Sequence, residues 1–265
     1  MIPFTKASAC GNDFIIIDGA HILQAINDRD AIFDISRRIC DRHNGVGADG
    51  VEWLFSAQDA DIHARLINAD GTEAEISGNG TRCVAAYLVD RDRKERLTVH
   101  TGAGIKHCEM VSRNQGRFEF EMDMGMPRVG DDFSIASSSG EVRGTPVSMG
   151  NPHYVIFVKD FAPDWRHQGE EIGRNQVFKQ GVNVEFVQVE GHTDVAVLFY
   201  ERGVGETQSS GTGSCASAVA AIARGHAASP LNVHAPGGTQ VVRWSGANVF
   251  LRGPAQLICR GEFLL

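Results

Sequence analysis

The sequence predicts an α+β protein of two pseudo-symmetric domains, each a mostly antiparallel sheet or barrel rolled around a central helix. A glycine-rich motif occurs twice in the chain of 265 residues, and each copy leads into a run of small and apolar residues. Short segments that alternate apolar and polar residues, separated by turn residues, occupy much of the remaining sequence. Short alternating segments of this kind favour antiparallel over parallel sheet.

The two copies of the motif read RLINADGTEAEISGNG at 65–80 and LFYERGVGETQSSGTG at 198–213. Ser77 falls on Ser210 at an offset of 133 residues, and Asn68 falls on Glu201 at the same offset. The runs TRCVAAYLV and SCASAVAAIA that follow predict helices from Thr81 to about Asp92 and from Ser214 to Arg224. Small side chains allow close approach of other backbones, so we expect both helices to be buried inside curved sheets.

Other elements follow from local pattern. Apolar spacing predicts a helix over 31–43, ended by Asn44-Gly45, and a short helix over 169–174. Strands are predicted at 97–100, 118–124, 194–200, 240–244 and 248–252. The acidic, serine-rich stretch 131–141 is expected to be a surface loop. We expect an N-terminal domain of residues 1–120, completed by a strand at 256–265, and a C-terminal domain of residues 121–255.

Bulk composition excludes several classes of protein. The formal net charge of −8 argues against a nucleic-acid-binding protein. No apolar run reaches the roughly 18–20 residues that span a bilayer, and the N-terminus lacks the pattern of a signal peptide. The six cysteines form no C-x-x-C pair, and no histidine cluster suggests a metal site. We therefore expect a cytoplasmic protein that has no metal and no membrane or nucleic-acid partner.

Each glycine loop at the start of a helix presents backbone N–H groups and the positive end of the helix dipole. Such a site binds anions. No Lys-Ser/Thr pair follows either loop, so neither is a phosphate-binding P-loop, and a carboxylate is favoured. The alternative is that both loops are only serine caps with glycine turns, since these residues are common in that role. The duplication and the polar residues near the loops favour a binding site for a zwitterionic amino acid; these residues are Asn12, Asn68, Asn151, Asn183, Glu201 and Arg202.

In these segments the chain closely resembles the diaminopimelate epimerase family. The similar segments, in the family's order, are GNDF at 11–14, DRHNGVGADG at 41–50, NADG at 68–71, GNGTRC at 78–83, GNPH at 150–153 and ERGVGET at 201–207. The resemblance implies an epimerase of lysine biosynthesis that interconverts L,L- and meso-diaminopimelate without a cofactor, in a cleft between two domains. It is compatible with a homodimer.

The resemblance also assigns roles to residues. It implies that Asn12, Asn68, Asn151, Asn183, Glu201 and Arg202 hold the polar groups of the substrate. It implies that the backbone at Gly78-Asn79 and at Gly211-Thr212 binds the reacting carboxylate and stabilises developing charge. His153 and Glu201 are expected to tune the two groups that move the proton.

The chain departs from the family at those two groups. The family places a cysteine before each Gly-x-Gly and uses the two thiols as base and acid, whereas this chain has Ser77 and Ser210. A thiol has a pKa of about 8.5, and a serine hydroxyl is closer to water, at about 15.7. The serine hydroxyl is below water in pKa, and a gap of roughly 5 pKa units or more adds at least about 7 kcal/mol to the formation of the base.

Several explanations remain open at this level. The two hydroxyls replace the thiols naturally, in a weakly active enzyme or one with another substrate, or two cysteines were deliberately exchanged for serine. Alternatively, the fold catalyses another isomerisation with a carboxylate base such as Glu75 or Glu201, as in the phenazine-biosynthesis relatives. A noncatalytic amino-acid-binding protein is a further alternative. If the two-base arrangement holds, the serine oxygens face each other across the cleft.

Overall fold

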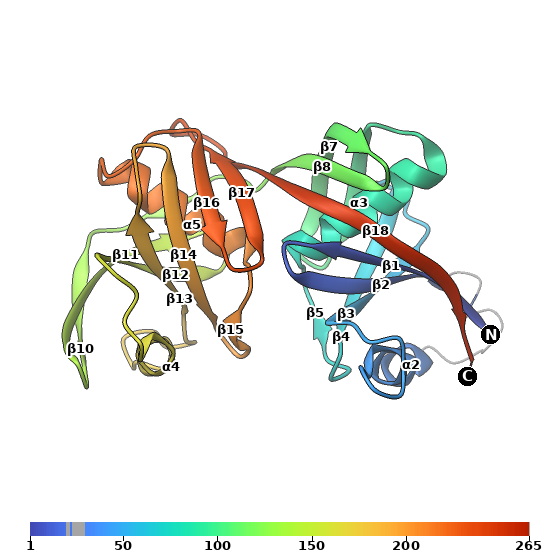
Figure 1. Ribbon diagram of the computed structural model, residues 1–265, viewed down its shortest axis with the longest axis horizontal. Helices are drawn as coiled ribbons and strands as arrows, with labels where there is room; N and C mark the ends of the chain where they lie inside the picture. The colour runs from blue at the N-terminus through green and yellow to red at the C-terminus, as the bar shows by residue number, and fades with distance from the viewer. Residues whose placement is uncertain (20–21, 23–29, 265) are drawn as a thin grey trace. The chain divides into compact units, whose positions relative to one another are not determined.

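The computed structural model describes residues 1–19, 22 and 30–264, and the chain forms two compact units (Figure 1). The first unit comprises Met1–Met122 together with Gly253–Leu265, and the second comprises Asp123–Arg252. The last strand, β18 (Phe250–Phe263), continues from the second unit into the first. Residue 265, the end of the strand expected at 256–265, lies outside the described residues.

The strands of the first unit pair into a closed barrel. β2–β3 and β4–β6 are parallel pairs, whereas β1–β2, β3–β4, β6–β7, β7–β8 and β1–β18 are antiparallel. The pairing of β8 with β18 closes the ring, and the two-residue strand β5 pairs with β4. The strands are β1 (Ile2–Ala9), β2 (Asn12–Asp18), β3 (Gly50–Phe55), β4 (Ile62–Asn68), β5 (Glu73–Ala74), β6 (Arg96–Thr101), β7 (Gly104–Asn114), β8 (Arg117–Asp123) and β18.

The second unit repeats this order of pairings. The parallel pairs β12–β13 and β14–β16 correspond to β2–β3 and β4–β6, and antiparallel pairs join β11–β12, β13–β14, β16–β17 and β17–β18. The predicted two-part α+β architecture is therefore confirmed. The strands are β9 (Arg128–Val129), β10 (Phe133–Ser137), β11 (Gly140–Ser148), β12 (Pro152–Val158), β13 (Asn183–Val189), β14 (Asp194–Glu201), β15 (Gly205–Thr207), β16 (Leu231–Ala235) and β17 (Gly238–Arg243).

Each unit surrounds one helix of small residues, α3 (Gly78–Asp92) in the first and α5 (Gly211–Ala223) in the second (Figure 1). Residues 83–86 of α3 and 215–221 of α5 are completely buried. Both helices begin three residues earlier than the sequence predicted, because the glycine loops themselves form their first turns. Among the described residues, no helix is both long and apolar enough to cross a membrane.

Within the described residues, two further helices cover the outside of the sheets. α2 (Ala31–Cys40) packs Ile32, Ile35 and Ile39 against β3, and α4 (Trp165–Gly173) packs on β13. α2 ends at Cys40 rather than at His43. The reason is local: the Asp41 carboxylate accepts the backbone N–H groups of His43 and Asn44, both at 2.7 Å, in place of a further helical turn.

The expectation of a surface loop over 131–141 is wrong. Residues Phe133–Ser137 form β10, which pairs in antiparallel register with β11. Ile135 is buried in the cluster that contains Tyr154, and burial of this alternating apolar position stabilises the strand despite the serines. Residues 131–132 and the turn at Ser138-Ser139 keep the expected loop character.

A buried hydrogen bond ties α2 to the first barrel, and its removal gives a test of the fold. The Trp53 indole N–H donates to Ser36 Oγ at 2.9 Å, and both side chains are inaccessible to solvent. Ser36→Ala leaves the indole N–H unpaired, so we expect the free energy of unfolding to fall by about 1–3 kcal/mol. Urea denaturation measures it. The exposed Ser134→Ala change should stay within about 0.5 kcal/mol of the wild type, and an equally small effect at Ser36 would contradict the prediction.

Candidate active site

The serines at the starts of the two central helices have the same geometry. Ser77 and Ser210 are extended N-cap residues, with φ of −122° and −136°. Their Oγ atoms accept the N–H groups of Gly80 at 3.1 Å and Gly213 at 3.2 Å. A cap satisfies one of the N–H groups that a helix start leaves without an intrahelical partner. Helix starts of this kind are a general anion-binding feature of proteins, and both central helices have one.

Amide and guanidinium groups next to the start of α3 form a hydrogen-bond network. Asn79 donates to Asn12 Oδ1 at 2.6 Å and accepts from Arg82. Asn12 in turn donates to Asp49 Oδ2 at 3.2 Å. Arg82 is completely buried. The structure therefore brings Asn12 and Asn79 together beside the start of α3, which also carries Ser77.

Charged residues hold Asp49, which lies at one end of this hydrogen-bond network. Asp49 accepts the backbone N–H of Asp13 at 3.0 Å and the guanidinium of Arg42 at 2.7 Å. Lys6 pairs with Asp13 at 2.9 Å. Although burial alone would raise it, hydrogen bonds from Arg42 and Lys6 hold the pKa of Asp13 below its usual value. Asn68 is not part of this hydrogen-bond network, because its side chain donates to Thr72 Oγ1 at 3.0 Å.

In the second unit a histidine connects a buried acid to the start of α5. His153 Nδ1 lies 2.7 Å from Glu185 Oε1, and its Nε2 lies 3.0 Å from Asn151 Oδ1. Asn151 then donates to Thr212 Oγ1 at 3.3 Å. Burial raises the pKa of Glu185, partly offset by His153. With Nε2–H directed at Asn151, the contact between His153 and Glu185 holds a single proton.

Glu201 lies next to Ser210 in the same unit. Burial raises the pKa of the Glu201 carboxyl, and hydrogen bonds from Thr207 and Ser210 act in the opposite direction. The Thr207 hydroxyl donates to Glu201 Oε1 at 2.7 Å. A buried carboxyl whose pKa is raised binds a proton more strongly than an exposed one does. Ser210 and Glu201 therefore form a hydroxyl–carboxyl pair within one unit.

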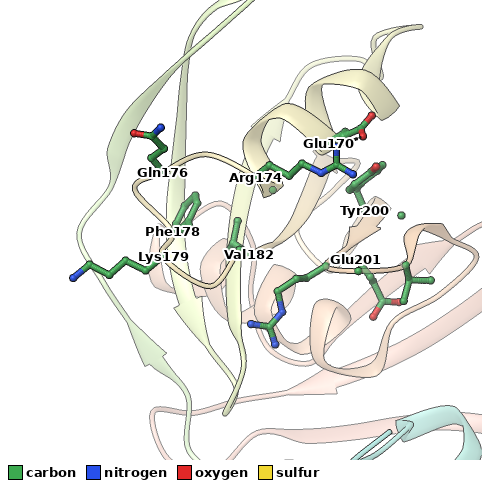
Figure 2. Close-up of a pocket in the computed structure, with 14 residues that line it drawn as sticks. Glu170, Arg174, Gln176, Phe178, Lys179, Val182, Tyr200 and Glu201 are labelled. Carbon is green, nitrogen blue, oxygen red and sulfur yellow. Dashed lines mark ion pairs between the residues drawn. The ribbon is translucent and has the colours of Figure 1, made fainter. Parts of the chain in front are cut away.

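The second unit also contains a cavity of about 650 Å³, which extends from Glu201 to α4 (Figure 2). Its lining carries charges of both signs, including Glu201, Arg202 and Lys179. The Arg202 backbone N–H donates to Asn183 Oδ1 at 2.9 Å, which brings these two predicted site residues together. A cavity with both charges suits a zwitterionic ligand.

Two buried acids, one in each unit, were missed from the sequence. Glu52 on β3 and Glu185 on β13 are 3% and 0% exposed, and they too are separated by the offset of 133. Burial raises the pKa of Glu52 to about 8. The signal was available: each is one glutamate within an apolar strand, GVEWLF and NVEFVQV.

Comparison with solved structures places the fold. A probable proline racemase from Agrobacterium radiobacter K84 aligns with a TM-score of 0.75 at 16% identity, covering 100% of this chain and 93% of the other. A PhzF-family protein from Bacillus anthracis aligns with a TM-score of 0.74 at 17% identity, covering 100% and 99%. The chain thus has the fold that these two proteins share.

Sequence comparison is more specific. The profile of the family described as diaminopimelate epimerase matches residues 4–129 and 145–258. A diaminopimelate epimerase from Elusimicrobium minutum is 38% identical over 281 residues, covering 99% of each chain. The chain belongs to the diaminopimelate epimerase family, and with it to the isomerases.

The pKa of Glu52 predicts a change of stability with pH. Its folded-state value of about 8 lies above the ordinary 4.5, so between these values unfolding releases a proton, and rising pH destabilises the wild type. Glu52→Gln removes this titration. Its stability relative to wild type should therefore grow by about 1.4 kcal/mol per pH unit within that window. Urea denaturation from about pH 5 to pH 9 measures the difference.

The control for this measurement is Glu109→Gln, which removes an exposed carboxylate paired with Arg96. Its stability should follow that of the wild type across the whole range. A constant difference between Glu52→Gln and wild type would show that Glu52 has an ordinary pKa in the folded protein.

Proposed function

We propose that this protein interconverts L,L- and meso-diaminopimelate in lysine biosynthesis, by two-base proton transfer at one α-carbon and without a cofactor. The observation that carries the proposal is the duplicated helix start, with a capping serine and a glycine turn at the N-terminus of the central helix in each unit. An epimerase needs one proton-transferring group for each face of the carbon. Ser77 and Ser210 provide such a pair.

The reaction begins with binding of the zwitterion. The backbone at Gly78-Asn79 and at Gly211-Thr212 receives the carboxylate of the reacting centre, since helix N-termini stabilise anions. The same N–H groups stabilise the negative charge that moves onto this carboxylate when the α-proton leaves. The remaining polar groups of the substrate are held by Asn12, Asn68, Asn151, Asn183, Glu201 and Arg202.

Proton transfer then uses the two hydroxyls. One serine receives the α-proton on one face, and the other donates a proton to the opposite face, so that the configuration inverts. At Ser210, the hydrogen-bonded carboxyl of Glu201 supplies or takes the balancing proton. His153, held between Glu185 and Asn151, sets the charge around Glu201 and thereby tunes Ser210. The two compact units serve as the two domains of the enzyme.

Exchange of the α-proton tests the function directly. In heavy water, NMR should show deuterium entering the α-position of L,L- and meso-diaminopimelate with formation of the other isomer. Calorimetry should show binding of both isomers. If the wild type and every variant bound diaminopimelate but none of them exchanged its α-proton, the protein would be a noncatalytic binding protein. Turnover of a different compound, with diaminopimelate inert, would identify another isomerase.

Restoring thiols tests the assignment of Ser77 and Ser210. The double change Ser77→Cys and Ser210→Cys should raise the epimerisation rate by orders of magnitude, because a thiolate forms at a far lower cost than an alkoxide. Each single change should raise exchange mainly for one stereoisomer. Ser134→Cys, on the exposed face of β10, is the matched control and should leave the rate unchanged. No gain from the double change would refute the assignment.

A further inference from the structure

Glu52 occupies an unusual place in the first barrel. Along β3, Val51 and Trp53 belong to the apolar cluster that α2 covers. Since successive strand residues point to opposite faces, Glu52 points the other way, into the barrel and toward α3. Glu52 as a whole is 3% exposed. Among the described residues, none forms a hydrogen bond or ion pair with Glu52. A buried carboxyl without a partner is costly and calls for an explanation.

The carboxyl lies against the first turn of α3. A Cβ atom placed on Gly80 would lie 2.1 Å from Glu52 Oε1 and 3.2 Å from Ser77 Cβ. The carboxyl and the Ser77 side chain therefore border the same small space, which the absence of a side chain at Gly80 leaves open. Any larger residue at position 80 would displace the carboxyl from its place beside Ser77.

The second unit fills the equivalent space differently. A Cβ atom on Gly213 would meet the Phe199 ring at 2.8 Å and Ser210 Cβ at 2.9 Å. There the carboxyl next to the serine comes from Glu201 at the end of β14. Each unit thus places one buried carboxyl beside its capping serine, from a different strand. The two carboxyls do not occupy equivalent positions of the repeat. At the offset of 133 residues, Glu201 corresponds to Asn68, and Glu52 corresponds to Glu185.

We propose that Glu52 is a positioning residue that exchanges a proton with the Ser77 hydroxyl, as Glu201 does with Ser210. The inference rests on the proposed epimerase function. When the α C–H bond breaks, its proton bonds to Ser77 Oγ and the original hydroxyl proton passes to the Glu52 carboxylate. The electron pair of the C–H bond moves onto the substrate carboxylate. The reverse steps return the proton. Rotation of one of the two side chains, or one bridging water, completes the contact.

The surroundings of Glu52 support this role. Its pKa of about 8 lies close to neutral pH, where an acid–base group is most effective. On α3, the charge of Glu52 acts on the buried Cys83 thiol. Burial is the main cause that raises the pKa of this thiol, and the charge of Arg82 opposes it. Ser77 Oγ accepts the Gly80 N–H, and this leaves the hydroxyl hydrogen to be transferred.

The test is deuterium exchange by Glu52→Gln, followed separately for each stereoisomer. Loss of the Ser77 relay should slow exchange at least about 100-fold for the isomer whose α-proton faces Ser77. The other isomer should still exchange with retention of configuration, through Ser210. Glu201→Gln is the matched comparison and should give the opposite pattern. Glu52→Asp, which keeps a carboxyl, should recover part of the lost rate.

The outcomes separate the two proposals. Equal losses for both isomers in Glu52→Gln, or no loss for either, would overturn the relay while leaving the epimerase function intact. Absence of exchange in the wild type and in the double cysteine variant would overturn the function and the relay with it. As a further readout, wild-type exchange at the Ser77 face should rise with pH toward a plateau above about 8, and this rise should vanish in Glu52→Gln.

Discussion

The rest of this structure depends on placing the N-terminus of a helix inside a barrel. A helix start carries unpaired N–H groups and a partial positive charge, and both are costly in an apolar interior. The chain meets this cost with a capping serine at each start and with small residues along the helix, so that the strands approach closely. The groups left over after capping are the ones to which we assign anion binding in the proposed function. The packing requirement and the chemistry therefore share one set of residues.

In the proposed reaction, hydroxyl groups in place of thiols at these two caps change how the proton is transferred. A thiol beside a helix N-terminus ionises near neutral pH without much help, whereas a serine needs a neighbouring base. The structure supplies buried carboxyls next to the caps, Glu201 by a direct hydrogen bond and Glu52 across the open space at Gly80. Burial raises the pKa of both. The desolvation that makes these acids expensive also makes them stronger bases than exposed glutamates.

Much of the fold was predictable because it depends on local pattern and on a repeat at a constant offset of 133 residues. The match of Ser77 with Ser210 located both central helices, although their starts were placed three residues late because glycine weakens a helical pattern. The strand β10 was missed because its serines are typical of loops. Its two large apolar residues, Phe133 and Ile135, depend for their burial on packing with α4 and β12. Such burial becomes visible only in three dimensions.

The candidate site also contains contacts that the sequence could predict and contacts that depend on the three-dimensional structure. Asn12 and Asn79 lie together, as do Asn183 and Arg202, whereas Asn68 bonds locally to Thr72. The partnership of His153 with Glu185 could not be predicted, since it requires the register of the parallel strands β12 and β13, 32 residues apart in the chain. Glu52 escaped notice because a strand buried on both faces resembles an ordinary apolar strand with one solvent-facing acid.

The path of β18 has a consequence for synthesis on the ribosome. The second unit is one continuous segment, Asp123–Arg252, and all of it precedes Gly253 in the chain. The first unit begins earlier but needs residues from Gly253 onward, because β18 fills the gap between β1 and β8. Until those residues leave the exit tunnel, β1 and β8 are open edges that can pair with other chains. The half of the protein that is made first is therefore the half that finishes folding last.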